Sequence, residues 1–421
     1  MSPVSSKRPF SEANPHALAI IMEAAETQRI IASTDIFDIQ GIKLWARDRP
    51  VSAELQRKLV DRQLRQPLES CLRAEDGVSP KALVQVTQEL LGGAGPVARV
   101  LQPHAGRLLE QVALLPLHSV AQLLLTAARA SRPSAFEHSV EAMALAGALM
   151  DARGGDAAQI RLALLAGLLH DLGEMYIDPT HGEADADRTL DFQSYQQLVV
   201  HPHVGQLLLA QLTDYPKALA QAVAVHHERM DGSGYPHGLQ GDRLPELGRM
   251  LMAVEAALAV LRYGPPQLAR ASIALRVVPG EFDLTWAAEI DRLARREAAA
   301  PASRDVAALV ARLTRLDEAL AEAGASIAVL ETTAESEQLH GAFSLAMGLL
   351  KRLRAGWFAS GLWDTSVVTV DDAAEVEAVE DELEFRLRAI ERAAWLRAGE
   401  LPQGDAHRLG LLGQSLRSVV G

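Results

Sequence analysis

The sequence predicts an all-α protein with more than one domain, and three observations support this prediction. The chain has 421 residues, which is more than one ordinary hydrophobic core accommodates. Aromatic residues make up only 4%, whereas Ala, Leu, Glu, Gln and Arg dominate long stretches, as they do in helices. Apolar residues also recur at helical spacing, most clearly towards the C-terminus. We therefore expect a helical bundle flanked by helical accessory regions.

Composition also restricts the partners and the compartment. The formal net charge of −13 argues against broad nucleic-acid binding, which requires many Lys and Arg residues, but leaves room for a small anionic ligand in a local positive pocket. Cys71 is the single cysteine and cannot form an internal disulfide. The first residues lack the apolar core of a signal peptide, and no apolar run reaches the roughly 18 residues of a membrane span. We expect a cytoplasmic protein without membrane insertion.

The first region, residues 1–130, is expected to be a mostly helical accessory region. Residues 1–17 are polar and predicted to be disordered. Two short apolar runs around Gly41 in "DIFDIQGIKLWARDRPVS" give a weak signal for a small β hairpin, and Ser52 then caps a helix through "AELQRKLVDRQL". A helical pattern follows from about Pro80 to the end of the region, interrupted at places such as "GGAGP".

The second region, residues 131–293, concentrates the histidines, since eight of the thirteen lie between His138 and His237. The third region, residues 294–421, carries two apolar stripes at helical spacing and is expected to form a helical bundle or coiled coil. The stripes consist of Val306, Leu309, Leu313, Leu316 and Leu320, and of Val376, Val379, Leu383, Leu387 and Ile390. The second stripe makes a homodimer through the C-terminal helices a reasonable prediction, and the flanking regions could bind signalling proteins.

Within the second region, several apolar helices each deliver a potential metal ligand. The helix "IRLALLAGLLHDLGEMYIDP" is expected to run to Asp178-Pro179 and to present His170 and Asp171 near its end. A neutral imidazole can bind one divalent cation, and a carboxylate with two oxygens can bridge two cations. His138 is expected to begin another helix. Further candidates follow in "VVHPHVGQLLLAQL", "AQAVAVHHERMDG" and "RMLMAVEAALAV", namely His201, His203, His226, His227 and Glu255.

A single candidate of this kind has a simpler explanation. One histidine on an apolar face is more often a buried core residue than a ligand, and Glu255 alone could pair with Arg249. His203, His181 and His237 are better placed on the surface or in a loop. Together, however, five segments that end in His-Asp, His-His and Glu favour a metal site.

The glycine-rich stretch "HHERMDGSGYP" also allows two interpretations. "DGSGYP" could be a plain tight loop, because Asp-Gly and Ser-Gly favour positive φ and Pro236 fixes the exit. As a functional element, the loop would hold Tyr235 over the metals with its hydroxyl directed at a phosphate. Asp231, Gly234 and Tyr235 are therefore the candidate substrate-binding residues.

These residues resemble the HD-GYP domains, a branch of the HD phosphohydrolase superfamily, over residues 131–293. "HHERMDGSGYPHGLQGDRLP" is similar to the signature of that family, and "LLHDLGE" is similar to its H-D-x-G-K motif. The resemblance implies an all-helical bundle that holds two or three metals, usually iron or manganese, and hydrolyses cyclic di-GMP or a related cyclic dinucleotide.

The resemblance also implies a ligand set, with Asp171 and His170 at the centre of catalysis. The first metal would be held by His138, His170, Asp171 and Glu255, and the second by His201, His226 and His227, with Asp171 bridging. Glu255 stands where the family has Asp. Members with three metals carry a Glu one helical turn before the first histidine, and here that position is Ser134. We therefore expect two divalent cations, Fe or Mn.

Three further departures concern the substrate. Glu174 replaces the lysine of H-D-x-G-K, and Gly264 and Gln267 stand where the family has phosphate-binding cations. A carboxylate in place of a cation reverses the interaction with a phosphate. Arg262, Arg270 or Arg243 could compensate for the loss.

Three functions remain open on this sequence. The first is a phosphodiesterase in which two cations activate a hydroxide that attacks the phosphorus of a cyclic dinucleotide, with cyclic di-GMP as the expected substrate. The second is a signalling receptor or scaffold that keeps the metals without turnover, which Glu174 favours. The third is a metal-dependent phosphohydrolase for another nucleotide or phosphate ester.

Overall fold

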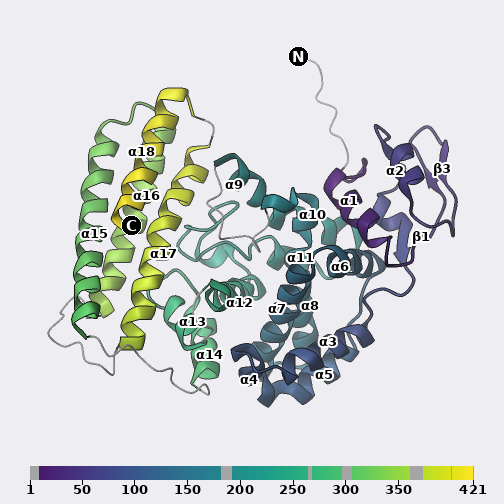
Figure 1. Ribbon diagram of the computed structural model, residues 1–421, viewed down its shortest axis with the longest axis horizontal. Helices are drawn as coiled ribbons and strands as arrows, with labels where there is room; N and C mark the ends of the chain where they lie inside the picture. The colour runs from purple at the N-terminus through teal and green to yellow at the C-terminus, as the bar shows by residue number, and fades with distance from the viewer. Residues whose placement is uncertain are drawn as a thin grey trace. The chain divides into compact units, whose positions relative to one another are not determined.

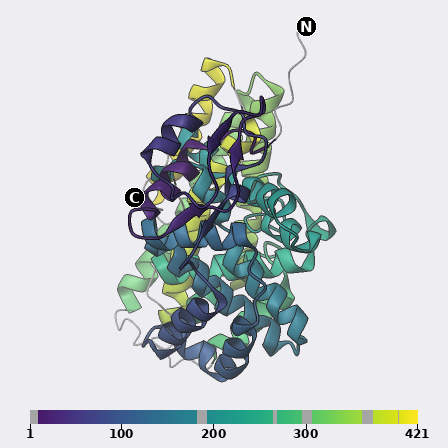
Figure 2. The ribbon, with the colours of Figure 1, turned by 90° about the vertical axis from the view of Figure 1, so that its right-hand side faces the viewer.

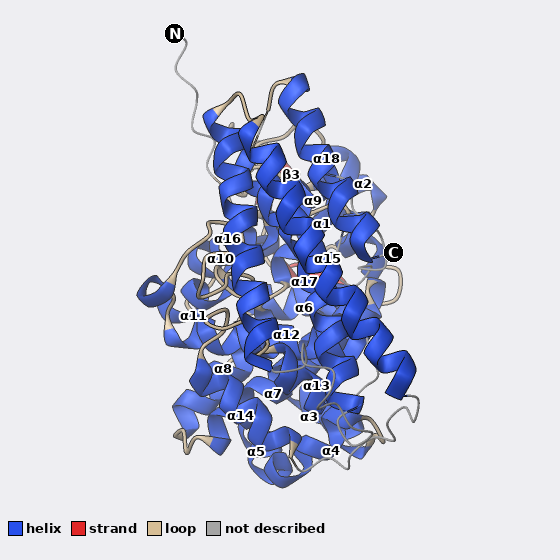
Figure 3. Cartoon of the chain, turned by 90° about the vertical axis from the view of Figure 1, so that its left-hand side faces the viewer, coloured by secondary structure: helices blue, strands red, loops and turns tan. Residues whose placement is uncertain are grey.

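The computed structural model describes residues 9–181, 192–263, 268–295, 306–360, 373–399 and 401–420. Helices dominate these residues and the strands are few and short, which confirms the predicted all-α class (Figure 3). The chain forms two compact units: residues 1–226 with 245–254, and residues 227–244 with 255–421. The described residues contain no helix that is both long and apolar enough to cross a membrane.

The first unit begins with α1 and four short strands, drawn in purple in Figure 2, and continues as helices. The predicted hairpin around Gly41 is confirmed, since β2 and β3 pair antiparallel and Gly41 has φ +86°. A second antiparallel pair, β1 with β4, was not predicted. The elements are α1 (Pro15–Ala24), β1 (Ile30–Ala32), β2 (Ile36–Phe37), β3 (Lys43–Trp45), α2 (Ala53–Leu59), β4 (Leu72–Ala74), α3 (Pro80–Gly92), α4 (Pro96–Leu101), α5 (Ala105–Ala113), α6 (Ser119–Ser131), α7 (Pro133–Ala152), α8 (Ala157–Leu169), α9 (Phe192–Leu198), α10 (His201–Leu212) and α11 (Lys217–Val223).

Helix α12 (Glu246–Tyr263) contains the boundary between the units, at Val254 and Glu255. The second unit continues with α13 (Leu268–Ala274) and α14 (Leu284–Ala294), and then the four long helices drawn in green to yellow in Figure 1. These are α15 (Val306–Thr332), α16 (Glu337–Ser360), α17 (Ala373–Ala398) and α18 (Gln403–Val420).

The four long helices form the predicted C-terminal bundle. Phe343 and Trp357 of α16 lie fully buried in its core, and the indole N–H of Trp357 donates to Asp317 of α15 at 2.8 Å. Leu313, Leu316 and Leu320 of the first predicted stripe are buried there, while the side chains of Val306 and Leu309 lie outside the description. The whole second stripe, 376–390, is also buried within the chain, so it gives no support to the predicted homodimer.

Several predicted boundaries are wrong for local reasons. Helix α1 begins at Pro15, so residues 9–17 are not disordered as expected. The side chain of Asn14 accepts hydrogen bonds from two amides of the first turn, and Pro15 suits the first helical position. The expected disorder of residues 1–8 lies outside the described residues. Helix α7 begins at Pro133 rather than at His138, again with a proline in first position.

The helix that delivers the His-Asp pair is shorter than predicted. Helix α8 ends at Leu169, and a 3-10 helix, η3 (Leu172–Tyr176), replaces the last predicted turns before Asp178-Pro179. The chain turns here because Gly173 packs directly on the backbone of α10, where a Cβ atom would lie 2.0 Å from the carbonyl oxygen of His201. Only glycine allows this approach, so η3 and the start of α10 lie together.

Candidate metal centre

Close packing of α7 on α8 positions the first two histidines. A Cβ atom added at Gly167 would lie 2.4 Å from the carbonyl oxygen of Ala142, and one at Gly147 would lie 2.5 Å from Leu164. Small residues at these two points let the helix backbones approach closely. The exposed fractions of His138 and His170 are 5% and 1%, and their Nε2 atoms lie 3.3 Å apart.

The backbone determines which nitrogen three of the histidines present. The Nδ1 atoms of His170, His201 and His226 lie 2.7, 2.8 and 2.6 Å from backbone carbonyl oxygens three residues earlier. A carbonyl can only accept, so each Nδ1 carries the proton. In the neutral imidazole, Nε2 then has a lone pair, which is the form that binds a metal.

Asp171 lies between two pairs of these histidines, and each of its carboxylate oxygens faces one pair. Its Oδ2 atom is 3.5 Å from Nε2 of His138 and 2.9 Å from Nε2 of His170. Its Oδ1 atom is 3.4 Å from Nε2 of His201 and 3.2 Å from Nε2 of His226. The oxygens thus point to two separate groups of nitrogen donors, which is the arrangement of a bridging carboxylate.

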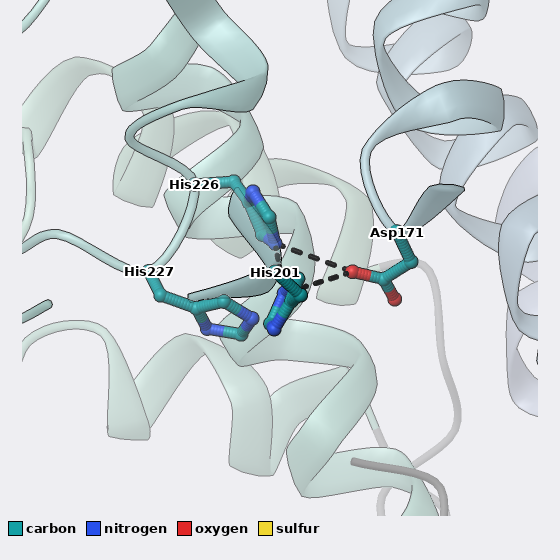
Figure 4. Close-up of side chains that lie close together, drawn as sticks. All are labelled: Asp171, His201, His226 and His227. Carbon is teal, nitrogen blue, oxygen red and sulfur yellow. Dashed lines mark hydrogen bonds and ion pairs between the residues drawn. The ribbon is translucent and has the colours of Figure 1, made fainter. Parts of the chain in front are cut away.

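Two further residues complete the ligand groups. His227 follows His226 directly, and Glu255 lies in α12. The groups are Asp171 with His201, His226 and His227, and Asp171 with His138, His170 and Glu255, and in each the ligand atoms lie within 4.8 Å of one another. Figure 4 shows the first group, with the three imidazoles gathered on one side of the Asp171 carboxylate. These are the two sets predicted from the sequence, including the substitution of Glu255 for aspartate.

The electrostatics keep these groups in their ligand forms. Burial opposes ionisation of Asp171, but the neighbouring imidazoles of His170, His201 and His226 hold its pKa well below the ordinary 3.8. Burial lowers the pKa of His226 from 6.5, which the nearby Asp171 carboxylate only partly opposes. Near neutral pH the carboxylate is therefore anionic and the His226 imidazole is neutral.

The donor set fits a pair of divalent cations. Two ligands that bind one cation at right angles, each at about 2.1 Å, are about 3.0 Å apart, and Nε2 of His201 and Nε2 of His226 are 3.1 Å apart. Oδ1 of Asp171 is buried without a well-aligned hydrogen bond, because it faces nitrogens whose lone pairs point inward. Protonating one imidazole would satisfy that oxygen once, whereas a cation satisfies the oxygen and the nitrogens together.

The glycine-rich loop after His227 is folded back on its own beginning. The rings of His227 and Tyr235 are stacked 4.6 Å apart, and the Tyr235 amide donates to the His227 carbonyl at 3.0 Å. Gly234 is required because a Cβ atom there would lie 2.4 Å from the Glu228 backbone. Asp231 accepts hydrogen bonds from the amide and hydroxyl of Ser233, so its carboxylate is engaged within the loop.

Glu228 closes the same loop and was not among the predicted site residues. Its side chain is fully buried and accepts hydrogen bonds from the amides of His237 and Leu239 at 2.8 and 2.9 Å. Burial raises its pKa, and these two amides oppose the shift. The acid after the two histidines was visible in the sequence, but nothing there indicated amides nine and eleven residues later as its partners.

The positions that depart from the family pattern lie in different surroundings. Glu174 is buried in η3, and its carbonyl accepts a hydrogen bond from Arg132 at 3.1 Å. Burial lowers the pKa of Arg132, and the negative charge of Glu174 opposes this, so a cation missed by the sequence analysis lies beside Glu174. Ser134 is exposed in the first turn of α7. Gly264 and Gln267 lie outside the described residues.

Two of the three arginines considered as replacements have described side chains, and these two lie in different surroundings. Arg270 forms an ion pair with Asp381 of α17, within the second unit. Arg243 is exposed in a short 3-10 turn. The side chain of Arg262 lies outside the description.

Comparisons with known proteins match the region of the chain that contains this site. The family model described as HD domain matches residues 122–276. The cyclic di-GMP phosphodiesterase PA4108 of Pseudomonas aeruginosa is 32% identical over 149 residues, 35% of this chain and 35% of the relative. The 3'3'-cGAMP-specific phosphodiesterase 3 of Vibrio cholerae is 26% identical over 141 residues, 28% of this chain and 30% of the relative. The response regulator RpfG of Xanthomonas campestris, also named a cyclic di-GMP phosphodiesterase, is 30% identical over 122 residues, 29% of this chain and 32% of the relative.

The matched part covers about a third of each of these relatives. No solved structure matched the chain. Residues 122–276 match an HD domain, and the described residues of that region include two groups of side chains that could hold a metal ion. Within the matched region, the Gly234-Tyr235-Pro236 motif is the part of the sequence that resembles the HD-GYP signature.

Proposed function

We propose that the protein is a metal-dependent phosphodiesterase that hydrolyses a cyclic dinucleotide, with cyclic di-GMP as the first substrate to test. The observation that carries the proposal is Asp171, whose two oxygens face two separate pairs of histidines. A carboxylate placed in this way suits a two-metal hydrolase, because in-line attack on phosphorus requires charge stabilisation on both the attacking and the leaving oxygen. The two substrates named among the relatives support the substrate class.

The residues of this chain divide the task. His138, His170 and Glu255 would hold one divalent cation, His201, His226 and His227 the other, and Asp171 would bind both. The cations would supply an activated water and neutralise charge on the phosphoryl group. Donors of imidazole and carboxylate type suit Fe or Mn. Tyr235, held against His227, would orient a substrate phosphate through its hydroxyl.

We propose that the chain is divided into three regions. Residues 131–293 would carry the catalytic domain, residues 1–130 an accessory region, and residues 294–421 a helical module. We also propose that the flanking regions bind signalling proteins. The protein would associate with itself and would be located in the cytoplasm.

A second candidate function is a receptor that binds the nucleotide and the metals without turnover. Glu174 favours this alternative, because it places a buried carboxylate where the family has a lysine. Arg132 beside it weakens this argument, since its positive charge offsets the negative charge of Glu174.

The test is metal content together with hydrolysis by anaerobically purified protein supplied with Mn or Fe(II). Cyclic di-GMP and 3'3'-cGAMP are each offered, and the nucleotides are separated by chromatography. We expect two metals per chain and a linear product in the wild type. Asp171→Ala should lose the metals and the activity. Asp214→Ala, which alters an exposed carboxylate of the same unit, should keep them. Two bound metals without product from either nucleotide would establish the receptor. Absence of bound metal in the wild type would overturn the metal centre itself.

A further inference from the structure

The loop of residues 227–244 is joined to the C-terminal helices by ion pairs. All the contacts concerned lie within the second compact unit. They connect positions more than a hundred residues apart in the chain, and they are made by helices α16 and α17, which carry none of the predicted ligands.

The first connection runs from α16 into the middle of the loop. Nε of Arg352 lies 3.1 Å from Oδ2 of Asp231, whose side chain is only 7% exposed. The other oxygen of Asp231 accepts hydrogen bonds from the Ser233 amide at 2.9 Å and from the Ser233 hydroxyl at 2.6 Å. One carboxylate therefore links α16 to the turn immediately before Gly234 and Tyr235.

The second connection runs from α17 to the beginning of the loop. Nε of Arg386 donates to the buried carboxylate of Glu281 at 2.9 Å, and Nε of Arg229 lies 3.4 Å from the other oxygen of that carboxylate. The Glu281 carbonyl also accepts the amide of Met230 at 2.9 Å. The guanidinium groups of Arg229 and Arg386 lie 4.8 and 5.9 Å from the ring centre of Phe282.

The helices that carry these arginines pack tightly near the same segment. A Cβ atom at Gly356 of α16 would lie 1.9 Å from the carbonyl oxygen of Val277, so helix and segment are in backbone contact. Val277 and Val278 belong to the bundle core with Trp357. A shift of α16 would therefore move Arg352 and the segment leading to Glu281 together.

We propose that Arg352 is a positioning residue, through which the C-terminal bundle holds the loop that carries His227 and Tyr235 in its binding form. Arg386 supports the same loop from α17 through Glu281. The bundle α15–α18 thus acts as the control element of the loop: a change in the position of α16 releases Asp231, and the turn before Tyr235 loses its anchor. This inference rests on the proposed function, because it assigns a role to residues around the same site.

The test uses the full chain loaded with Mn and compares Arg352→Ala with Arg352→Lys and with Lys351→Ala. Lys351 is the exposed neighbour on α16 and provides the matched loss of one positive charge. Amide hydrogen exchange, metal affinity, kcat and KM are measured for each protein. We expect faster exchange confined to residues 229–240 in Arg352→Ala, and about a 10-fold loss of kcat/KM, which is the lower end of the loss seen when a direct partner of a metal ligand is removed. Arg352→Lys should recover part of the loss, and Lys351→Ala should behave as wild type.

A double-variant cycle guards against general unfolding. Asp231→Asn removes the same ion pair from the other side, and the double variant should be no worse than the poorer single variant, because both changes break one interaction. Unchanged exchange in residues 229–240 in both single variants, or fully additive losses, would overturn the proposal. If Arg352→Ala does not fold, Asp231→Asn alone decides. Exchange and metal affinity do not need turnover, so a wild type without hydrolysis would refute the proposed function and leave this inference separately testable.

Discussion

The bridging carboxylate with its histidines and the loop after His227 are held in place by different physical means. His170, His201 and His226 are oriented by neutral hydrogen bonds to carbonyls three residues earlier, inside apolar surroundings. The loop is held by charged groups, with Arg352 on Asp231 and with Arg386 and Arg229 on Glu281.

This difference suggests that the histidines and the loop respond to different parts of the chain. Local hydrogen bonds fix the tautomer of each imidazole whenever its own helix forms. The metal-binding form of each histidine therefore depends on a short stretch of chain. The ion pairs of the loop depend on helices from elsewhere in the sequence, and breaking one buried pair leaves an uncompensated charge. The ligands should therefore respond mainly to changes in their immediate neighbourhood, and the loop to changes at a distance.

The largest expected effect comes from removing one of the helix-held ligands. His201→Ala should abolish binding of one cation and lower kcat/KM by about 10³-fold or more, because a metal supplies several kcal/mol of transition-state stabilisation. His203→Ala is the matched control, since His203 lies on the same helix but is exposed. Metal content and steady-state kinetics measure both effects. Equal losses in the two variants would contradict the role of His201.

Comparison of the ligands with the loop also shows what a sequence can reveal. The candidate ligands that the structure brings together could be selected from the sequence, because His170-Asp171 and His226-His227 are adjacent pairs in a recognisable motif. The partners of the loop were not, because no local pattern connects Asp231 with Arg352. The break after α8 was also missed, since it depends on contact between Gly173 and α10, which the apolar pattern of the helix does not contain. Conversely, Asn14 and Pro15 are a recognisable helix start in the sequence. The prediction of disorder missed it because it relied on the polar composition of residues 1–17.

A smaller effect is expected at the glycine where η3 meets α10. Gly173→Ala would place a methyl group 2.0 Å from the His201 carbonyl oxygen, which the backbone can relieve only by shifting. Overpacking of this kind costs about 1–3 kcal/mol, and the shift would also displace the adjacent Asp171 and lower metal affinity. Denaturant unfolding and metal titration measure the two consequences. Gly106→Ala is the control, since no atom lies within 4 Å of its added carbon, and a loss there as large as at Gly173 would refute the steric explanation.

The smallest effects are expected at two buried glutamates, one that faces arginines and one that accepts a hydrogen bond from a neutral hydroxyl. Glu281 faces Arg386 and Arg229, whereas Glu69 accepts a hydrogen bond at 2.6 Å from the hydroxyl of Tyr176, the last residue of η3. Burial raises the pKa of both carboxyls, and the two arginines oppose the shift at Glu281, whereas the Tyr176 hydroxyl opposes it at Glu69. We expect Glu281→Gln to cost about 1–2 kcal/mol, because it removes the carboxylate charge that faces both Arg386 and Arg229, and Glu69→Gln to cost less than about 1 kcal/mol, since an amide oxygen still accepts from Tyr176.

The dependence of stability on pH gives a separate test at Glu69. Because the pKa of Glu69 in the folded protein lies above the ordinary 4.5, the folded state binds the proton more tightly than the unfolded state. Its contribution to stability is complete below pH 4.5 and is lost as the pH rises through the raised folded value. Glu69→Gln cannot lose it, so its stability relative to wild type should be more favourable at about pH 8 than at about pH 5. Chemical denaturation at the two pH values measures this difference, and a Glu69→Gln variant that loses more stability at the higher pH would show that the charged form of Glu69 is the stabilising one.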